Sequence, residues 1–250
     1  MLKRLVNKCL QWLGFEIVST SRIGSRAIRD AARVLQLLND DAILIFDVGA
    51  NDGGTAASMR QTFPGATIYC FEPFRTTFDR LSKKFRRSHG IICEQMGFSD
   101  KAGNVACVVH ENSELNSVRA ELNSRSSNQT PETVKLSTID EYCYQENIER
   151  ISLLKTDTEG FDLHVLRGAR SMLESGKIDV IVCEVGVQRD DSRHTPLWHV
   201  SEFLQERGYR IVSIAEQMPS QTNLQMDYCN AVFALRSLLL LSSRIGRNDL

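Results

Sequence analysis

Short apolar runs alternate along this chain with longer segments of helical periodicity. Runs rich in β-branched residues predict strands at residues 42–48, 66–72, 91–95, 151–157, 178–185, 209–215 and 230–235. Amphipathic segments between them predict helices at residues 53–63, 75–87, 161–175 and 195–207. Several strand runs, such as "IDVIVCEV", are apolar throughout, which is typical of parallel strands covered on both faces. This rhythm predicts an α/β fold with a doubly wound, mostly parallel seven-stranded sheet.

Two parts of the chain depart from this rhythm. Within residues 98–135, "KAGNVACVVHE" predicts a turn and an extra strand, and the Ser- and Asn-rich segment at 111–130 predicts a loop. We interpret that loop as a source of hydrogen bonds to a polyhydroxylated ligand, as a lid or as a plain connector. We expect residues 1–40 to form a short N-terminal helical extension, residues 41–236 the main domain and residues 237–250 a C-terminal tail.

The first residues predict an amphipathic helix. Apolar and basic side chains fall on opposite sides of it, at Leu2, Leu5, Val6, Cys9, Leu10 and Leu13 on one and at Lys3, Arg4 and Lys8 on the other. Such a helix packs on its own domain, covers a partner subunit in a homodimer or makes weak contact with an anionic membrane surface. No apolar run approaches the roughly 18 residues that span a bilayer, and no secretory signal is expected.

Charge and cysteine content narrow the function classes. The chain has 30 basic and 31 acidic residues, a formal net charge of −1, so we expect no nucleic-acid partner. Its seven cysteines are odd in number and contain no C-x-x-C pair, which argues against a zinc knuckle. Free thiols in a reducing compartment are the simpler interpretation, and we therefore expect a cytoplasmic protein.

The stretch "IFDVGANDGG" (residues 45–54) places acids and glycines at the end of the first predicted strand. In open α/β sheets, ligands bind beyond the carboxyl ends of the strands, where glycines let the backbone approach them. The spacing is not the G-x-G-x-x-G fingerprint of nicotinamide enzymes, and Asp47 and Asp52 would repel a pyrophosphate. A ligand with a cationic centre, such as S-adenosylmethionine, suits these acids.

A further acid follows the second predicted strand. Glu72, before Pro73, lies close to the offset of about 20 residues at which an acid takes ribose hydroxyls. The two strand ends together favour S-adenosylmethionine as the cofactor. The alternatives are a nicotinamide-dependent Rossmann enzyme, a non-catalytic donor-binding scaffold in a biosynthetic complex, and an ordinary βα turn with solvated acids.

With these elements placed, the chain resembles the FkbM family of S-adenosylmethionine-dependent methyltransferases. The matching segments follow the family's order between residues 45 and 169: "FDVGANDGG", "CFEPFRTTFDRL", "MGFSDKAGNV", "TIDEY" and "LLKTDTEGFDLHVLRGA". The resemblance implies a Rossmann-like class I methyltransferase fold. It also implies O-methylation of a hydroxyl on a sugar, glycan or other small natural product, in polysaccharide or natural-product biosynthesis.

The resemblance also assigns donor contacts at the ends of the first four predicted strands, namely Asp47, Gly49, Asn51, Glu72, Pro73, Gly97, Phe98, Ser99 and Asp157. The first three would lie near the methionine part of the donor, and Glu72 would hold the ribose hydroxyls. The segment from Gly97 to Ser99 would flank the adenine, and Asp157 would face the sulfonium and the acceptor. The chain departs from the family where Thr156 and Thr158 replace the usual isoleucine and valine around that acid.

Methyl transfer to a hydroxyl needs alignment of the reactants and removal of one proton. The candidate catalytic residues share a predicted position at the carboxyl edge of the sheet or in a nearby loop, and they are Asp157, Glu159, Glu184 and His194. We expect Asp157 and Glu159 to orient the acceptor or to act as the base. His194 is the candidate whose unperturbed pKa is near neutrality.

Simpler interpretations compete with these roles. Glu159 is also placed to cap a helix that begins near Gly160, and Glu184 to bond an adjacent loop. His194 also fits a surface residue, and Lys155 a structural partner of a neighbouring acid. His164 and Trp198 lie in apolar helical patterns and are expected in or near the core. Paired acids are compatible with a divalent cation that binds a sugar diol, but we assign no metal ligand from the sequence.

Overall fold

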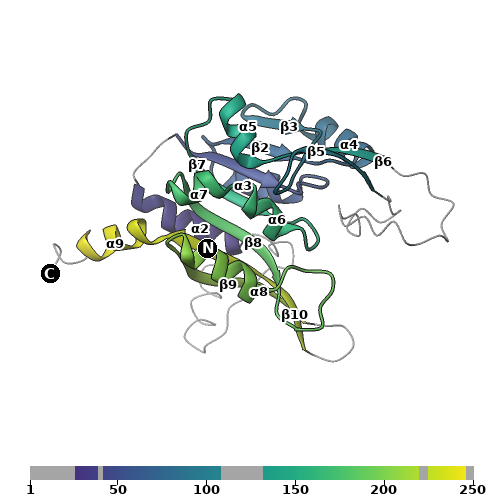
Figure 1. The fold of residues 1–250 in the computed structure, drawn as a ribbon. Coiled ribbons are helices and arrows are strands. Elements are labelled where there is room, and N and C mark those ends of the chain that lie inside the picture. The colour runs from purple at the N-terminus through teal and green to yellow at the C-terminus, as the bar shows by residue number, and fades with distance from the viewer. Residues whose placement is uncertain (1–25, 39–41, 108–131, 220–224, 246–250) are drawn as a thin grey trace, which may run out of the picture.

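The computed structural model describes residues 26–38, 42–107, 132–219 and 225–245 (Figure 1). Its central sheet has seven strands in the order β3-β2-β1-β7-β8-β10-β9. Their bounds are β1 Leu44–Val48, β2 Thr67–Phe71, β3 Ile91–Glu94, β7 Ile151–Thr156, β8 Ile178–Gly186, β9 Tyr209–Pro219 and β10 Met226–Leu235. The first five are parallel to their neighbours within that group, whereas β10 is antiparallel to both β8 and β9. The prediction of a mostly parallel seven-stranded sheet is confirmed.

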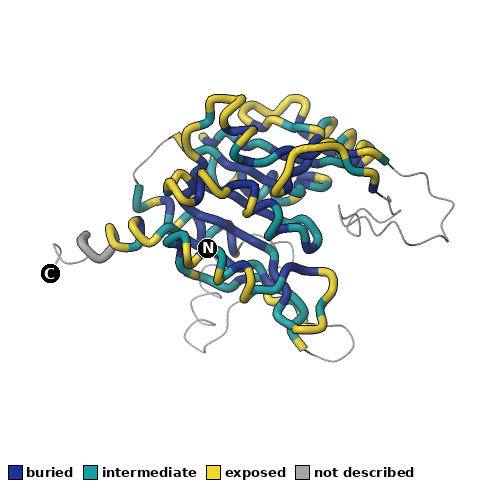
Figure 2. The backbone as a smooth tube through the Cα atoms, viewed as in Figure 1, coloured by how far each residue is buried: buried dark blue, intermediate teal, exposed yellow. Residues whose placement is uncertain are grey.

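Helices cover both faces of this sheet. They are α2 (Arg26–Leu35), η2 (Gln36–Leu38), α3 (Gly54–Thr62), α4 (Arg75–Phe85), α5 (Ile139–Gln145), α6 (Asp162–Arg167), α7 (Arg170–Glu174), α8 (Leu197–Glu206) and α9 (Arg236–Ile245). Alternate strand residues enter separate cores: Phe46 packs in a cluster with residues of α5 to α8, and Ile45 in one with residues of α2, α3 and α4. Figure 2 shows the buried strands between the more exposed helices.

The segment around residue 100 forms a second, smaller sheet. The predicted extra strand is β5 (Gly103–Cys107), which pairs antiparallel with β6 (Glu132–Ser137). The short β4 (Gly97–Phe98) pairs parallel with β6 on its other side. The sequence pattern predicted neither β6 nor this sheet, because β6 lies next to the polar loop segment. The predicted 111–130 loop and the predicted helix at the N-terminus lie outside the described residues.

The predicted helix at 161–175 is broken into α6 and α7 at Gly168. A Cβ on Gly168 would lie 2.0 Å from the backbone oxygen of Ser99, so the chain between α6 and α7 packs directly against the backbone just after β4. This close approach anchors α6 beside the end of β7, where the candidate acids lie.

Helix α2 belongs to the predicted N-terminal extension, yet it packs firmly on the main sheet. Its buried side chains face β8, β9 and β10. The Glu216 carboxylate of β9 accepts hydrogen bonds from the first backbone N–H groups of α2, at 2.7 Å from Arg26 N and 3.2 Å from Ala27 N. These contacts supply partners for the otherwise unsatisfied amides of a helix start.

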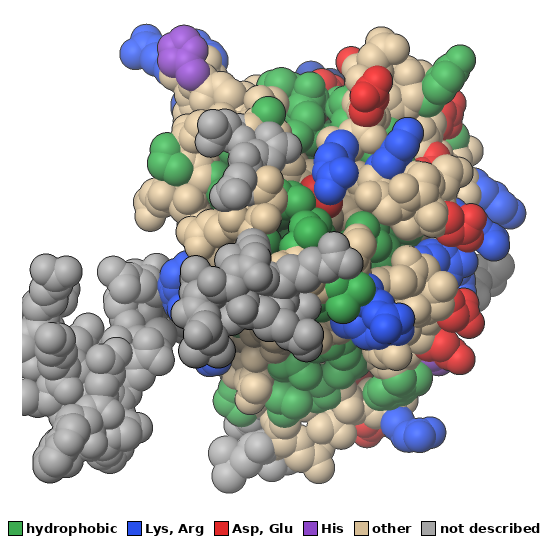
Figure 3. Space-filling model, turned by 90° about the vertical axis from the view of Figure 1, so that its left-hand side faces the viewer, with side chains coloured by type: hydrophobic (Ala, Val, Ile, Leu, Met, Phe, Trp, Pro, Cys, Tyr) green, Lys and Arg blue, Asp and Glu red, His purple; other side chains and the backbone are tan. Residues whose placement is uncertain are grey.

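The described surface carries mixed charge. On the face shown in Figure 3, acidic and basic side chains are interspersed rather than gathered into one patch. The six cysteines among the described residues are free thiols. Within those residues, no helix has both the length and the apolar character needed to cross a membrane.

Candidate active site

A cavity of about 350 Å³ opens at the carboxyl edge of the central sheet, beside β1, β2, β7 and β8. This is the position at which open α/β sheets bind ligands. Most of the predicted site residues line it, namely Gly49, Asn51, Glu72, Pro73, Gly97, Phe98, Asp157, Glu159, Glu184 and His194. The structure thus brings together the strand ends that the sequence singled out.

The turn after β1 is shaped by left-handed backbone and close packing. Gly49, Asn51 and Gly53 have φ values of 77°, 46° and 77°. A Cβ on Gly49 would lie 1.9 Å from the backbone oxygen of Asp157, so only glycine lets the turn lie against the end of β7. The amides of Gly49 and Ala50 both donate to the Phe71 carbonyl, at 3.0 and 3.1 Å. The turn is therefore fixed to two neighbouring strands.

Glu72 lies at the end of β2 with its carboxylate buried in the cavity wall. Its Oε2 accepts a hydrogen bond from Asn51 N at 3.1 Å, and its Oε1 accepts one from Phe74 N at 3.0 Å. Burial raises the pKa of Glu72 to about 7, although these two hydrogen bonds oppose the shift. A carboxylate held by backbone amides in this way keeps acceptor capacity for hydroxyl groups of a ligand.

A buried lysine links the acids of β1 and β7. Lys155, whose side chain is 5% exposed, has its Nζ 2.9 Å from Asp157 Oδ2 and 3.5 Å from Asp47 Oδ1. Burial alone would raise the pKa of Asp157, but the Lys155 charge and hydrogen bond outweigh it and hold that pKa below its ordinary value. Asp157 is therefore a fixed negative charge at the cavity.

Two predicted donor contacts lie behind the cavity rather than in its wall. Asp47 is fully buried with Lys155, and burial raises its pKa above the ordinary value. Ser99 is buried too; its amide donates to Ser137 O and its hydroxyl to Asp100 Oδ1. The structural pairing considered for Lys155 is confirmed, and its partners are Asp157 and Asp47.

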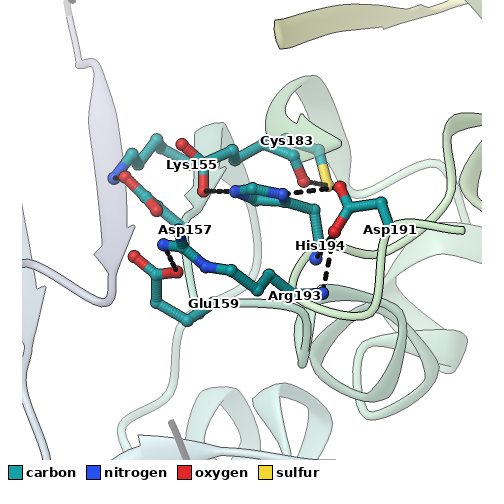
Figure 4. Close-up of polar contacts among 8 residues, drawn as sticks. Lys155, Asp157, Glu159, Cys183, Asp191, Arg193 and His194 are labelled. Atoms are coloured by element: carbon teal, nitrogen blue, oxygen red, sulfur yellow. Dashed lines mark hydrogen bonds and ion pairs between the residues drawn. The ribbon is translucent and has the colours of Figure 1, made fainter. Parts of the chain in front are cut away.

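Glu159, Glu184 and His194 converge at the other end of the cavity, where one ligand-capable atom of each lies within 4.8 Å of the others. Figure 4 shows Glu159 beside Arg193, and His194 beside Asp191. Burial raises the pKa of Glu159 to about 7, and the negative charge of Asp157 adds to the shift. Burial raises the pKa of Glu184 to about 10, again with Asp157 as the next cause. This end of the cavity is rich in carboxyl groups that resist ionisation together.

The imidazole of His194 is held in a defined orientation. Its Nδ1 lies 2.7 Å from Asp191 Oδ2, and Asp191 Oδ1 accepts hydrogen bonds from the amides of Arg193 and His194. The ring stacks on Tyr228, with 4.5 Å between ring centroids. Its Nε2 points to Glu184, 3.8 Å from Oε2.

Several of the simpler interpretations are wrong. His194 is not a surface residue, because its side chain is 6% exposed. Glu159 does not cap α6, which begins at Asp162 with Phe161 at the N-cap position and no side-chain cap. His164 and Trp198 are each 40% exposed rather than packed in the core. His164 instead stacks on Phe161, with 4.4 Å between ring centroids.

The sequence did not identify Asp191, Arg193 or Tyr228 as site residues. Arg193 Nη2 lies 3.4 Å from Glu159 Oε2, and both residues line the cavity. Asp191 precedes His194 by three residues in "RDDSRH", a spacing that could have indicated an acid–imidazole pair. Tyr228 had no such indication, because it comes from the antiparallel strand β10.

Comparison with known proteins identifies the chain. The Methyltransferase FkbM domain matches residues 47–211. The chain belongs to the FkbM methyltransferase family. The resemblance to this family noted in the sequence is therefore confirmed. The chain is an S-adenosylmethionine-dependent methyltransferase rather than a nicotinamide enzyme.

Two proteins of known name are similar in sequence to this chain. Hexuronic acid methyltransferase AglP of Haloferax volcanii is 29% identical over 170 residues, which cover 66% of this chain and 67% of that protein. 2-O-methyltransferase NoeI of Sinorhizobium fredii is 25% identical over 153 residues, which cover 56% of this chain and 63% of that protein. The alignments thus span about two thirds of the length of each relative.

Solved structures are similar to this chain in their fold alone. The METTL16 MTase domain superposes with a TM-score of 0.53 at 12% identity, covering 88% of this chain and 70% of that one. The human methyltransferase 10 domain containing protein superposes with a TM-score of 0.50 at 11% identity, covering 94% and 95%.

Proposed function

We propose that this methyltransferase transfers a methyl group from S-adenosylmethionine to a hydroxyl of a sugar, glycan or other small natural product. The observation that carries the proposal is one continuous cavity with a donor-like end at Gly49 and Glu72 and an acid- and imidazole-rich end at Glu159, Glu184 and His194. The names of the two relatives, a hexuronic acid methyltransferase and a 2-O-methyltransferase, support a sugar acceptor. The mixed surface charge favours such an acceptor over nucleic acid.

The residues at the first two strand ends fit the donor. We assign the ribose hydroxyls to Glu72, whose buried carboxylate suits O–H donors, and the methionine part to the turn containing Gly49 and Asn51. The adenine is assigned to the wall formed by Pro73, Gly97 and Phe98. Asp47 and Ser99 lie behind the cavity wall, and Asp47 contributes indirectly, through its ion pair with Lys155.

S-adenosylmethionine supplies a methyl group on a positively charged sulfur. Asp157, fixed by Lys155, provides a negative charge that suits this sulfonium and orients the acceptor beside it. As the acceptor oxygen bonds to the methyl carbon, the carbon–sulfur bond breaks with its electron pair left on sulfur. The hydroxyl proton passes to one of the carboxylates, Asp157 included, or to the imidazole that line the cavity, a transfer typically worth about 10²–10⁴-fold in rate.

The test separates donor binding from transfer. Calorimetry should show binding of S-adenosylmethionine and no binding of NAD. With methyl-labelled donor and pooled hexuronic acids, hexoses and glycans, the native protein should label an acceptor. Asp157→Asn and Glu159→Gln should bind donor but lose at least about tenfold in rate. Asp79→Asn, an exposed acid on α4 outside the cavity, is the matched control and should keep the native rate.

Two results would contradict the proposal. Donor binding without label in any pooled hydroxyl compound would favour the non-catalytic scaffold. Native rates in folded, donor-binding Asp157→Asn and Glu159→Gln variants would remove the catalytic roles of these acids.

A further inference from the structure

We propose that Glu159, Glu184 and His194 bind a divalent metal ion at the acceptor end of the cavity. The three ligands come from separate elements, namely the turn between β7 and α6, the end of β8, and the segment before α8. The proposal that these side chains bind an ion is independent of the proposed function. The role of that ion in methyl transfer rests on the proposed function.

The distances suit one shared ion. One atom from each residue lies within 4.8 Å of the others. Two ligands on opposite sides of an ion, each at about 2.1 Å, stand about 4.2 Å apart. Rotation about the side-chain bonds of Glu159 and Glu184 would bring their carboxylate oxygens closer to this spacing.

His194 supplies an independent indication of a ligand. The Asp191 carboxylate on Nδ1 fixes the tautomer in which Nε2 carries a lone pair. That nitrogen accepts no hydrogen bond from the described residues, and at 3.8 Å from Glu184 Oε2 it is beyond hydrogen-bond range. Its side chain is 94% buried and aims at the two glutamates. A carboxylate on the far nitrogen of the imidazole is the usual outer partner of a metal-binding histidine.

The surrounding fold is built to hold this pair. A Cβ on Gly186 would lie 2.5 Å from Asp191 Oδ2 and 3.1 Å from His194 Cβ, so glycine at the end of β8 makes room for both. Tyr228 stacks on the imidazole from β10. The ring is therefore positioned before any ligand arrives, as a metal site requires.

The local charges also favour a cation. Asp157, Glu159 and Glu184 all line this part of the cavity, and the facing cations are Lys155 and Arg193. Lys155 is shared between Asp47 and Asp157, and Arg193 lies 3.4 Å from Glu159. Neither cation forms an ion pair with Glu184 in the described structure, where Glu184 shares a hydrogen bond with Asp157 and lies near His194. A divalent ion would balance the remaining carboxyl groups.

The ligand set indicates the class of ion. Two carboxylates and one imidazole suit a first-row ion such as Mn²⁺ better than Ca²⁺, which prefers oxygen ligands alone. Three protein ligands leave positions for two hydroxyls of a sugar diol. An ion bound there would make such a hydroxyl more acidic, and the proton would pass to Asp157, which lines the same cavity and is not a ligand.

The test measures Mn²⁺ binding to the chelator-treated full chain by electron paramagnetic resonance. We expect one Mn²⁺ per chain and a nitrogen hyperfine coupling from an imidazole ligand. Glu184→Gln and His194→Asn should each weaken binding at least about tenfold, and Asp191→Asn about 10–100-fold through the imidazole. His164→Ala is the matched control, because its imidazole also pairs with an aspartate, Asp100, but outside the cavity lining.

Absence of Mn²⁺ binding, absence of the nitrogen coupling, or native Mn²⁺ affinity in folded Glu184→Gln and His194→Asn variants would overturn the metal site. Calorimetry with S-adenosylmethionine on the same samples reports the donor site separately. Methyl transfer that persists in excess chelator would leave the proposed function intact and remove the ion from it. Mn²⁺ binding without methyl transfer would support the metal site while contradicting the proposed function.

Discussion

At the scale of single residues, the site depends on one buried cation. Asp47 and Lys155 are register partners on β1 and β7, so their side chains leave the sheet on the same side and meet. The described structure gives the Asp47 carboxylate no hydrogen bond, and its ion pair with Lys155 is its compensation for burial. Lys155 thereby connects the interior of the sheet to Asp157 at the cavity.

Removal of the Lys155 charge should be costly. Lys155→Met keeps the bulk of the side chain but leaves two acids without their cation, and breaking a buried pair from one side costs about 3–5 kcal/mol. Asp47→Asn should cost clearly less, because Lys155 keeps Asp157 as a partner at 2.9 Å. Urea unfolding of the two variants measures the difference. Equal losses would mean that the pair with Asp157 contributes little.

The titration of Glu72 should control donor binding. Its pKa is raised to about 7, so the carboxyl is largely protonated at pH 6 and largely ionised at pH 8. Only the ionised form accepts hydrogen bonds from both backbone amides and the ribose hydroxyls at once. Affinity for S-adenosylmethionine should therefore rise about tenfold from pH 6 to pH 8.

Glu72→Gln is the control for this pH dependence. The variant should bind the donor more weakly than the native protein at pH 8 and should lose most of the slope. Calorimetry at the two pH values measures both quantities. A slope that survives in Glu72→Gln would assign the titration to another group.

At the scale of elements, the site depends on a turn that fits against a strand end. Gly49→Ala would place a Cβ 1.9 Å from the backbone oxygen of Asp157 at a residue with φ of 77°. Because that oxygen is backbone, relief requires the end of β7 to move, and we expect a loss of at least about 4 kcal/mol. The affinity of the Gly49→Ala variant for S-adenosylmethionine should fall as well.

Gly65→Ala is the matched control for Gly49→Ala. Gly65 follows α3, and an added Cβ there would meet no atom within 4 Å. Its free energy of unfolding should stay within about 0.5 kcal/mol of the native value. Thermal unfolding and calorimetry on both variants check the pair, and a mild effect of Gly49→Ala would contradict the close contact.

The strand ends explain how much of the site was predictable. Glu72 and Asp157 follow the parallel strands β2 and β7, and Glu184 lies near the end of the parallel strand β8. The topology alone brings such strand ends to one edge of the sheet. Tyr228 reaches the site only because β10 runs antiparallel to β8 in the register that sets it opposite Gly186. That register depends on long-range pairing, which a local pattern does not encode. The break at Gly168 has the same origin in a distant backbone contact.

At the scale of the whole molecule, the N-terminal segment and the main sheet share one core. Sequence periodicity assigned residues 1–40 to an extension, but α2 buries Ala27, Ile28, Ala31 and Leu35. These side chains belong to the same cluster as Val180 of β8 and Val232 of β10. The strands that end at the active site are therefore covered on one face by a helix from outside the matched family region.

This arrangement predicts that α2 contributes to the stability of the catalytic domain. Ile28 is 1% exposed, so Ile28→Ala should lower the free energy of unfolding by about 2–4 kcal/mol through lost burial and a residual cavity. Arg33→Ala, on the exposed side of the same helix, removes only a surface pair with Asp30 and should cost about 0.5 kcal/mol or less. Chemical unfolding followed by tryptophan fluorescence compares them. A loss for Ile28→Ala as small as that for Arg33→Ala would mean that residues 41–236 form their core without the extension, whereas the expected large difference would make α2 part of the folding unit that holds β8 and, at its end, Glu184.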